Sequence, residues 1–420
     1  MARILHGLIL AAGFVGGAAA QNQTGGQGLH ALMVAAGKLY FGTAMETNNF
    51  NDMAYQAISS NRNEFGMFTP ENSQKWEVTE PTQNQFSFTQ ADQVAMKVKS
   101  NGQLLRCHTL TWHSQLPGFV TTTTWTRATL TAALTAHITN VMKHYAGFCY
   151  AWDVVNEALN EDGSFRQSVF FKTLGPSYIP LSFSLAAAAD PTAKLYYNDF
   201  NLETTAAKAD GALKIVQLIQ SPPQNITGAR IDGVGFQAHL NVGQTPTRAQ
   251  LAATLRRFTA LGVEVAYTEL DIAHTKLPAS EADNQKQAAD YVATVGSCLD
   301  VKECVGITVW QFSDKYSWVP GTFPGKGEAC LYTEGFEKKV AYEAVVGLLR
   351  STAGGSAGVG AGTGTGRGNA TATGGLRGTG TASTSGVTEA AVPGAFSGAQ
   401  RVRGAWMGLG VLPLAVGWVM

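Results

Sequence analysis

Charged residues are scarce and unclustered in this chain. They make up 14% of its 420 residues, with 30 basic and 30 acidic side chains and a formal net charge of zero. The sequence has no cluster of Lys and Arg that would create the positive field required by a phosphate backbone. We therefore expect no nucleic-acid partner.

The sequence also lacks the patterns of a metal site or a nucleotide-binding loop. His108 and His113 do not match a zinc-ligand spacing such as His-x-x-x-His on a helix. The glycine repeats between residues 358 and 368 follow no predicted strand and precede no predicted helix, so they are typical of a linker. We expect neither a metal nor any other cofactor.

The cysteines are few and odd in number. Cys298 and Cys304 close a short loop, and we expect a disulfide between them. Among the remaining Cys107, Cys149 and Cys330, at least one thiol must stay free. Because Cys107 and Cys149 lie in strand-like apolar runs, we expect both to be small, inert buried side chains. No cysteine has a local pattern that would activate a catalytic thiol.

The two ends of the chain carry apolar runs too short for a comfortable membrane span. Residues 1–20 have Arg3, an apolar stretch and three final alanines, the layout of a secretory signal that we expect to be cleaved after Ala20. Residues 401–420 end in an almost wholly apolar tail, typical of the removable signal for a glycolipid (GPI) anchor. A transmembrane tail anchor is the alternative. We expect a secreted protein, with membrane or cell-wall attachment where the lipid anchor forms.

Composition divides the region between these ends into two parts. Residues 351–400 contain 15 of the 47 glycines, mixed with Ala, Thr and Ser, and too few bulky apolar groups to form a core. We expect this stretch to be a disordered linker that follows a single catalytic domain over residues 21–350. Candidate glycosylation sites of the Asn-x-Ser/Thr type are Asn22, Asn225 and Asn369.

Within the predicted domain, strand-like and helical segments alternate. The candidate strands lie at residues 39–44, 67–71, 105–110, 150–157, 195–200, 233–239, 263–271 and 306–312. The candidate helices between them are Ala91–Asn101, Arg127–Tyr145, Thr204–Ile219, Arg248–Leu261 and Glu281–Cys298. Eight such units over about 310 residues predict an α/β fold of the closed (β/α)8 TIM-barrel type.

Polar and aromatic residues gather where these strands end, which is where a barrel of this type forms its active site. They are Glu71, Asn72, His108, Asn156, Glu157, Asn198, Asp199, Gln237, His239, Glu269, Asp271, Trp310 and Gln311. A single carboxylate at a strand end is often only a helix cap or a solvated loop residue. So many polar strand ends together are hard to attribute to capping alone.

Two glutamates in this set suit the hydrolysis of a glycosidic bond. A retaining enzyme needs one proton donor and one ionised carboxylate, with the two carboxyl groups about 5 to 5.5 Å apart. His239 could hydrogen-bond Glu269, and Asp271 could orient that histidine, which would keep Glu269 ionised as the nucleophile. Glu157 is then the acid/base, and we expect its apolar surroundings to disfavour its ionisation.

The segments WDVVNE and YTELDI, which contain these glutamates, resemble the two catalytic motifs of glycoside hydrolase family 10, the β-1,4-xylanases. FTPENSQKW, HTLTWHSQLP, YNDFNLE, GVGFQAHL and SDKYSW also occur in the expected order, so the resemblance covers residues 37 to 349. It implies a retaining endo-hydrolase of xylan. The substrate-binding residues that it implies are Glu71, Asn72, Lys75, His108, Trp112, Gln115, Asn156, Tyr197, Asn198, Gln237, His239, Trp310 and Trp318.

One position departs from the family pattern and bears on function. Gln311 stands where the family commonly has Gly, and we expect its long side chain to narrow the cleft. The expected partner is xylan, and we expect a monomer. Two alternatives stay open at this stage: a β-1,4-glucanase that uses the same two glutamates, and a non-catalytic carbohydrate-binding protein on the cell surface.

Overall fold

The computed structural model describes residues 28–357. The expected secretory signal, the C-terminal signal of residues 401–420, and the sites Asn22 and Asn369 lie outside the described residues. Within the described range, no helix combines the length and the apolar character that a bilayer crossing requires. Asn225 lies in an exposed turn before the sixth strand.

The core of the fold is a closed ring of parallel strands. The strands are β1 (Tyr40–Met45), β2 (Met67–Pro70), β3 (Leu104–Trp112), β4 (Cys149–Asn156), β5 (Lys194–Asp199), β6 (Gly233–Phe236), β7 (His239–Asn241), β8 (Glu264–Ala273) and β9 (Cys304–Val309). Consecutive strands from β1 to β6 pair with one another, β6 pairs with β8, and β9 pairs with both β8 and β1. Eight strands therefore close the barrel, and the predicted fold is confirmed.

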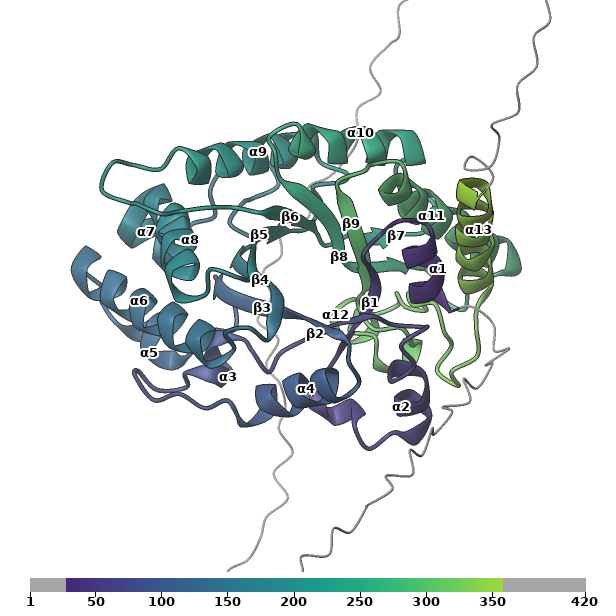
Figure 1. Cartoon of the computed structure of the whole chain (residues 1–420), viewed down its shortest axis with the longest axis horizontal. Helices are drawn as coiled ribbons and strands as arrows, with labels where there is room; N and C mark the ends of the chain where they lie inside the picture. The colour runs from purple at the N-terminus through teal and green to yellow at the C-terminus, as the bar shows by residue number, and fades with distance from the viewer. Residues whose placement is uncertain (1–27, 358–420) are drawn as a thin grey trace, which may run out of the picture.

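Helices surround the ring of strands on its outside (Figure 1). They are α1 (Leu29–Ala35), α2 (Met53–Ser59), α3 (Trp76–Thr79), α4 (Thr89–Ser100), α5 (Gly118–Thr122), α6 (Arg127–His144), α7 (Val169–Leu174), α8 (Tyr178–Ala189), α9 (Ala206–Gln220), α10 (Arg248–Thr259), α11 (Glu281–Leu299), α12 (Val319–Thr322) and α13 (Val340–Ala357). Short 3-10 helices are η1 (Thr47–Asn49), η2 (Gly175–Ser177) and η3 (Asp314–Tyr316). The five predicted helices begin and end within two residues of α4, α6, α9, α10 and α11.

The helices bury one face because their apolar residues recur at helical spacing. In α6, Leu130, Leu134, Ile138 and Val141 are all fully buried, as expected for an amphipathic helix that covers a sheet. Thr126 caps the N-terminus of this helix, because its hydroxyl accepts the N–H of the third helical residue.

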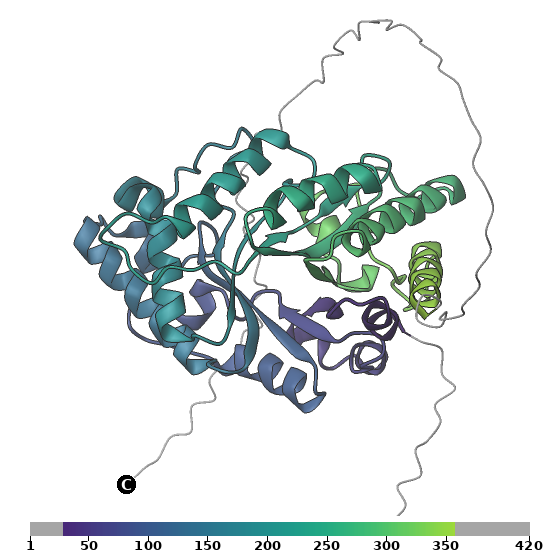
Figure 2. The same cartoon turned by 45° about the horizontal axis from the view of Figure 1, so that its top comes forward.

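Two predicted boundaries differ from the structure. The predicted strand at residues 233–239 divides into β6 and β7, because Ala238 adopts a left-handed backbone with φ of 60° and turns the chain. The expected domain boundary at Arg350 falls within α13, which continues to Ala357. Helix α13 packs against α1 and α11, so the last helix of the barrel covers the first (Figure 2).

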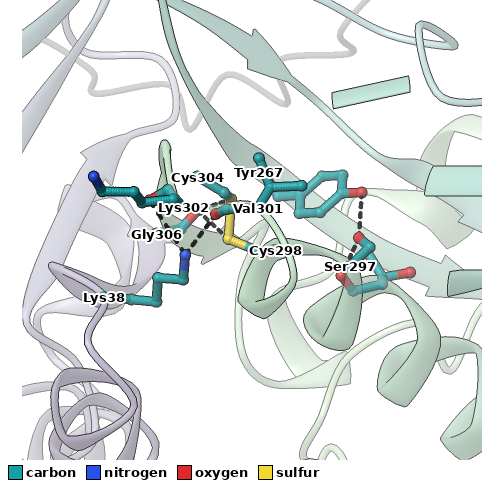
Figure 3. Close-up of a disulfide and its surroundings, with 9 residues drawn as sticks. Lys38, Tyr267, Ser297, Cys298, Val301, Lys302, Cys304 and Gly306 are labelled. Carbon is teal, nitrogen blue, oxygen red and sulfur yellow. Dashed lines mark hydrogen bonds between the residues drawn. A yellow bond between two sulfur atoms is a disulfide. The ribbon is translucent and has the colours of Figure 1, made fainter. Parts of the chain in front are cut away.

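The predicted Cys298–Cys304 disulfide is present and joins the end of α11 to the start of β9 (Figure 3). The Lys38 ammonium donates to the carbonyl of Val301, 2.6 Å away, in the turn that this disulfide closes. Since Lys38 precedes β1, these contacts connect the beginning of the barrel to its final unit.

Cys107 and Cys149, whose pairing the sequence left open, form a second disulfide between β3 and β4. In the register of these strands, Cys149 lies opposite Leu105, two residues from Cys107, so both sulfur atoms lie on one face of the sheet. Strand register is not visible in the sequence. Cys330 is a buried free thiol.

Candidate active site

The strands bring the predicted residues together at the C-terminal end of the barrel. Glu71 and Asn72 follow β2, His108 and Trp112 lie in β3, Asn156 ends β4, Asn198 lies in β5, His239 lies in β7, Glu269 and Asp271 lie in β8, and Trp310 follows β9. Glu157 comes directly after β4 with a left-handed φ of 54°. Its N–H donates to the carbonyl of Asn198 at 2.9 Å, which fixes the backbone turn at this glutamate.

The Glu157 carboxylate accepts hydrogen bonds from two other segments and from the preceding residue. Trp112 Nε1 donates to Oε2 at 2.9 Å, and Gln237 Nε2 donates to Oε1 at 3.0 Å. Asn156 Nδ2 lies 3.3 Å from the same Oε1. These donors orient the carboxyl group.

The ionisation expected for Glu157 from its apolar strand is wrong for this structure. Burial by itself favours the neutral form, but His113 and the donors Gln237 and Trp112 outweigh it and lower the pKa of Glu157 below its usual range. The free site therefore contains an ionised Glu157. Groups from other parts of the chain decide this outcome, and the sequence around Glu157 does not reveal them.

Glu269 lies on the opposite side of a short chain of amides. Asn198 Nδ2 donates to Glu269 Oε1 at 2.8 Å and lies 2.9 Å from Asn156 Oδ1. The Thr268 hydroxyl donates to Asn198 Oδ1 at 2.6 Å and fixes the orientation of that amide. The two glutamates are thus linked through Asn156 and Asn198.

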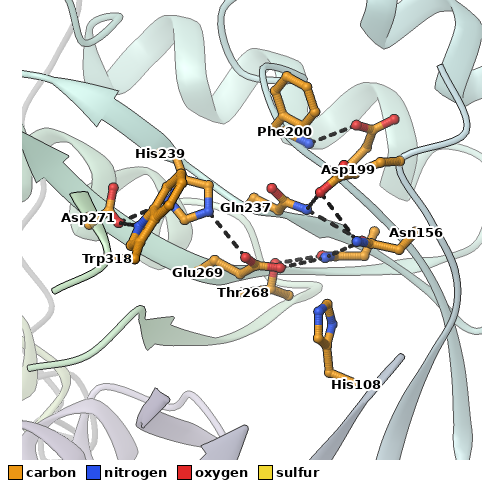
Figure 4. A network of polar contacts seen from close by, with 12 residues as sticks. His108, Asn156, Asp199, Phe200, Gln237, His239, Thr268, Glu269, Asp271 and Trp318 are labelled. Carbon is orange, nitrogen blue, oxygen red and sulfur yellow. Dashed lines mark hydrogen bonds and ion pairs between the residues drawn. The ribbon is translucent and has the colours of Figure 1, made fainter. Parts of the chain in front are cut away.

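His239 lies between Glu269 and Asp271, as Figure 4 shows. Its Nε2 is 3.1 Å from Glu269 Oε2, and its Nδ1 is 3.0 Å from Asp271 Oδ2. Trp318 Nε1 donates to the same Asp271 oxygen at 2.7 Å. Burial alone would lower the pKa of His239, yet the facing carboxylates of Asp271 and Glu269 raise it to about 10. The imidazole is therefore a cation at neutral pH, and it stabilises negative charge on Glu269.

A second polar group lies beside the Trp112 ring. Lys75 Nζ donates to Asn72 Oδ1 at 3.0 Å and to Gln115 Oε1 at 2.6 Å, and it lies 4.8 Å from the centre of the Trp112 ring. Burial lowers the pKa of Lys75, although the carboxylates of Glu269, Glu71 and Glu157 oppose that effect. This cluster offers hydrogen-bond donors and an aromatic face, the combination that binds pyranose rings.

His108 and Trp310 form part of the wall between these groups. His108 Nδ1 lies 2.9 Å from Asp153 Oδ2, and Asp153 also pairs with the buried Arg106. The Trp310 ring meets the His108 ring edge-on at 5.7 Å and lies 6.4 Å from His239. The buried Asp153 carboxylate, which is paired with Arg106, thus holds His108 in one orientation.

Tyr197 does not fit the predicted role in sugar binding. It is fully buried, and its hydroxyl donates to Asp199 Oδ2 at 2.5 Å. A side chain with no exposed surface has no face for a sugar. Asn198 is also fully buried, and its amide serves Glu269 and Asn156 rather than open space.

Sequence reasoning missed Glu46 and Arg166. Glu46 follows β1, and its Oε2 accepts the backbone N–H groups of Asn72 and Ser73 at 2.9 and 2.8 Å. Its place after the first strand matches the pattern that identified the other residues. Arg166 Nε donates to the backbone carbonyl of Glu157 at 3.2 Å, and no local motif indicated this contact.

Among residues 28–357, no group of three or more His, Cys, Asp or Glu side chains is arranged to hold a metal ion.

The family model for glycosyl hydrolase family 10 matches residues 28–348. The chain belongs to glycosyl hydrolase family 10. It is 60% identical over 330 residues to endo-1,4-beta-xylanase 5 of Pyricularia oryzae, covering 79% of this chain and 80% of that protein. It is 56% identical over 322 residues to endo-1,4-beta-xylanase 1 of Humicola insolens, covering 76% of this chain and 74% of that protein.

Solved xylanase structures share this barrel. The xylanase from Bispora sp. MEY-1, solved with xylobiose, has a TM-score of 0.73 and 40% identity, and the match covers 76% of this chain and 99% of that one. Penicillium canescens endo-1,4-beta-xylanase XylE has a TM-score of 0.74 and 40% identity, with 77% of this chain and 98% of that chain covered.

Proposed function

We propose that this chain is a retaining endo-β-1,4-xylanase in which Glu269 is the nucleophile and Glu157 the acid/base. The observation that carries the assignment is the cationic His239, which contacts Glu269 and is itself paired with Asp271. A cation held beside a carboxylate stabilises its negative charge, which suits a nucleophile. Glu157 instead accepts hydrogen bonds from the neutral donors Trp112 and Gln237.

The reaction takes place in two displacements. Glu157 gives its proton to the glycosidic oxygen while Glu269 attacks the anomeric carbon, so the glycosidic bond breaks and a glycosyl ester forms. Water then enters, Glu157 takes its proton, and the hydroxide attacks the anomeric carbon and frees Glu269. Two inversions at the same carbon give net retention.

Glu157 must take up a proton before the first displacement, because it is ionised in the free site. A bound sugar that draws Gln237 or Trp112 away from the carboxyl removes hydrogen bonds that favour the anion. That change raises the pKa of Glu157 and prepares it as the acid.

Chemical rescue with azide tests the assignment. We expect Glu269→Ala to lose turnover on an aryl β-xylobioside and to form the inverted α-xylobiosyl azide when azide is added. Glu157→Ala should form the retained β-azide, because its nucleophile is intact. Asp210→Ala, which removes an exposed carboxylate on α9, is the control and should behave as the unaltered protein. A retained azide from Glu269→Ala would reverse the two roles.

Initial rates on two polysaccharides test the substrate. We expect faster release of reducing ends from xylan than from a soluble cellulose derivative, and no release from either by Glu157→Gln. Faster cleavage of the cellulose derivative would identify a β-1,4-glucanase. Binding to xylan with no release by the unaltered protein would identify a carbohydrate-binding protein.

We further propose that the protein is secreted as a monomer and carries a GPI anchor. Its two disulfides are typical of proteins outside the cytosol, and the exposed Asn225 is open to glycosylation. The mass of the mature protein should show removal of residues 1–20. Release from intact cells by a phosphatidylinositol-specific phospholipase should depend on residues 401–420, and a tail that resists the enzyme would indicate a transmembrane anchor.

A further inference from the structure

Gln311 occupies an unusual position at the end of β9. Its backbone is left-handed, with φ of 68°, a conformation that suits Gly and strains a residue with a long side chain. The side chain is only 2% exposed. The expectation that it narrows the cleft is therefore wrong, because the side chain is directed into the protein.

The buried amide of Gln311 has a partner for every polar atom. Nε2 donates to Glu71 Oε1 at 2.5 Å and lies 3.2 Å from Asn49 Oδ1. Oε1 accepts from the Tyr55 hydroxyl at 3.0 Å. Because both amide protons and the amide oxygen are engaged, the orientation of the group is fixed.

Tyr55 and Asn49 anchor this amide to a different part of the chain. Tyr55 in α2 is fully buried, and its ring packs on Phe312 at 4.6 Å between ring centres. Asn49 ends η1 and also accepts the Glu46 N–H through Oδ1 at 2.8 Å. The contacts therefore join the last strand of the barrel to the segment that follows the first.

The Glu71 carboxyl is held by the Gln311 amide. Within the described residues, Gln311 is the one side chain that hydrogen-bonds the Glu71 carboxyl. The charged groups that act on Glu71 are Glu46 and Glu269, which repel its negative charge, and Lys75, which attracts it. Burial has the largest effect, and together these influences raise the pKa of Glu71 to about 7, although Gln311 opposes the rise.

We propose that Gln311 is a positioning residue that aims the Glu71 carboxylate at the glycone side of the cleft and so sets the affinity for a second sugar beyond the cut. This inference rests on the proposed xylanase function and on the assignment of Glu71 to sugars on that side. Glu46 fixes the backbone after Glu71 through Asn72 and Ser73. Gln311 fixes the carboxyl itself, so the two contacts together leave Glu71 little freedom.

Two substrates of different length test the proposal. An aryl β-xyloside places one sugar on the glycone side, whereas an aryl β-xylobioside places two. We expect Gln311→Met, which has similar length but no donor, to lower kcat/KM for the xylobioside about tenfold through KM, the range for a lost hydrogen bond to a charged group. The same variant should change kcat/KM for the xyloside less than about twofold.

The pH dependence gives a readout that a purely structural role would not move. In the unaltered protein, the ratio of kcat/KM for xylobioside to that for xyloside should fall as pH decreases through about 7, because Glu71 becomes protonated. Loss of the Gln311 donor disfavours the anion, so in Gln311→Met this midpoint should move to higher pH.

Further variants test whether misfolding explains the loss and whether the effect passes through Glu71. Gln311→Gly relieves the left-handed backbone and should keep its melting temperature while losing xylobioside affinity. In a protein that already carries Glu71→Gln, Gln311→Met should lower kcat/KM for the xylobioside little further. An equal loss on both substrates, an unmoved pH midpoint, or no loss in either Gln311 variant would overturn the proposal. An unaltered protein that hydrolyses neither substrate would instead refute the xylanase assignment.

Discussion

The charge on His239 is set by its two carboxylate neighbours. With a pKa of about 10, the imidazole carries its proton through the neutral range, and the stabilisation that it gives Glu269 is lost only as pH rises through that value. The Asp271 carboxylate is the largest favourable influence on that proton. The alkaline limit of activity should therefore depend on Asp271, a residue two positions beyond the nucleophile.

Asp271→Asn removes this charge while it keeps an oxygen for the Trp318 N–H. We expect the pKa of His239 to fall, so the alkaline limb of kcat/KM on xylan should move to lower pH by about one to three units. A pH profile between 5 and 11 measures the shift, with Asp210→Asn on the outer helix α9 as the control. An alkaline limb that stays in place would show that His239 does not govern Glu269.

The sequence predicts the acidic residues of the site better than it predicts their ionisation. Glu157, Glu269 and Asp271 could be identified because each follows or lies in an apolar strand that ends at the same face of a barrel. The pKa of Glu157 could not be predicted, because His113, Gln237 and Trp112 approach it from other parts of the chain. Contacts between side chains far apart in the chain decide such values.

At the scale of single elements, the two disulfides constrain very different lengths of chain. Cys107 and Cys149 are 42 residues apart, whereas Cys298 and Cys304 are separated by six. The entropy removed from the unfolded chain grows with the length of the closed loop. The bond that the sequence did not predict should therefore contribute more to stability.

Replacing both cysteines of each disulfide by Ala tests which disulfide contributes more to stability. We expect Cys107→Ala with Cys149→Ala to lower the free energy of unfolding by about 4 kcal/mol, and Cys298→Ala with Cys304→Ala by about 2 kcal/mol. Urea denaturation followed by circular dichroism measures both against the unaltered protein. Equal losses, or a larger loss from the short loop, would contradict the loop-length argument.

The predicted helix α6 and the unpredicted helix α8 differ in how clearly their sequences show a helical pattern. In residues 127–145, large apolar side chains recur every three to four positions, and the segment closely matches α6. In contrast, α8 has the sequence YIPLSFSLAAAA, in which apolar residues occur on every side and no period of 3.6 stands out. It packs against α6, α9 and β4, so its burial on several sides removes the pattern.

At the scale of the whole molecule, α13 completes the barrel by covering its beginning. Ala341, Tyr342, Val345, Val346 and Leu349 are all buried, and α13 lies against α1 and α11. The Tyr342 hydroxyl donates to Glu64 Oε2 at 3.1 Å, and the Tyr332 hydroxyl donates to Oε1 at 2.9 Å. The end of the folded domain thus satisfies a buried carboxylate that precedes β2.

This arrangement predicts where the chain can be shortened. A chain that ends at Ala357 keeps the contacts of α13 with α1 and α11. We therefore expect it to melt at the temperature of the full chain and to hydrolyse xylan at the same rate. A chain that ends at Lys339 exposes the partners of four large apolar side chains, each of which contributes about 2 kcal/mol when buried. That loss is comparable to the total stability of a domain, about 5 to 15 kcal/mol.

We therefore expect the chain that ends at Lys339 to be unfolded or to melt far below the full chain, with no xylan hydrolysis. Thermal unfolding and reducing-end release distinguish the two shortened chains. The substitution Tyr342→Phe within the chain that ends at Ala357 isolates the hydroxyl, and it should lower the free energy of unfolding by about 1 to 3 kcal/mol because Glu64 loses a buried hydrogen bond. A stable, active chain without α13 would mean that the barrel folds without a helix packed on α1 and α11.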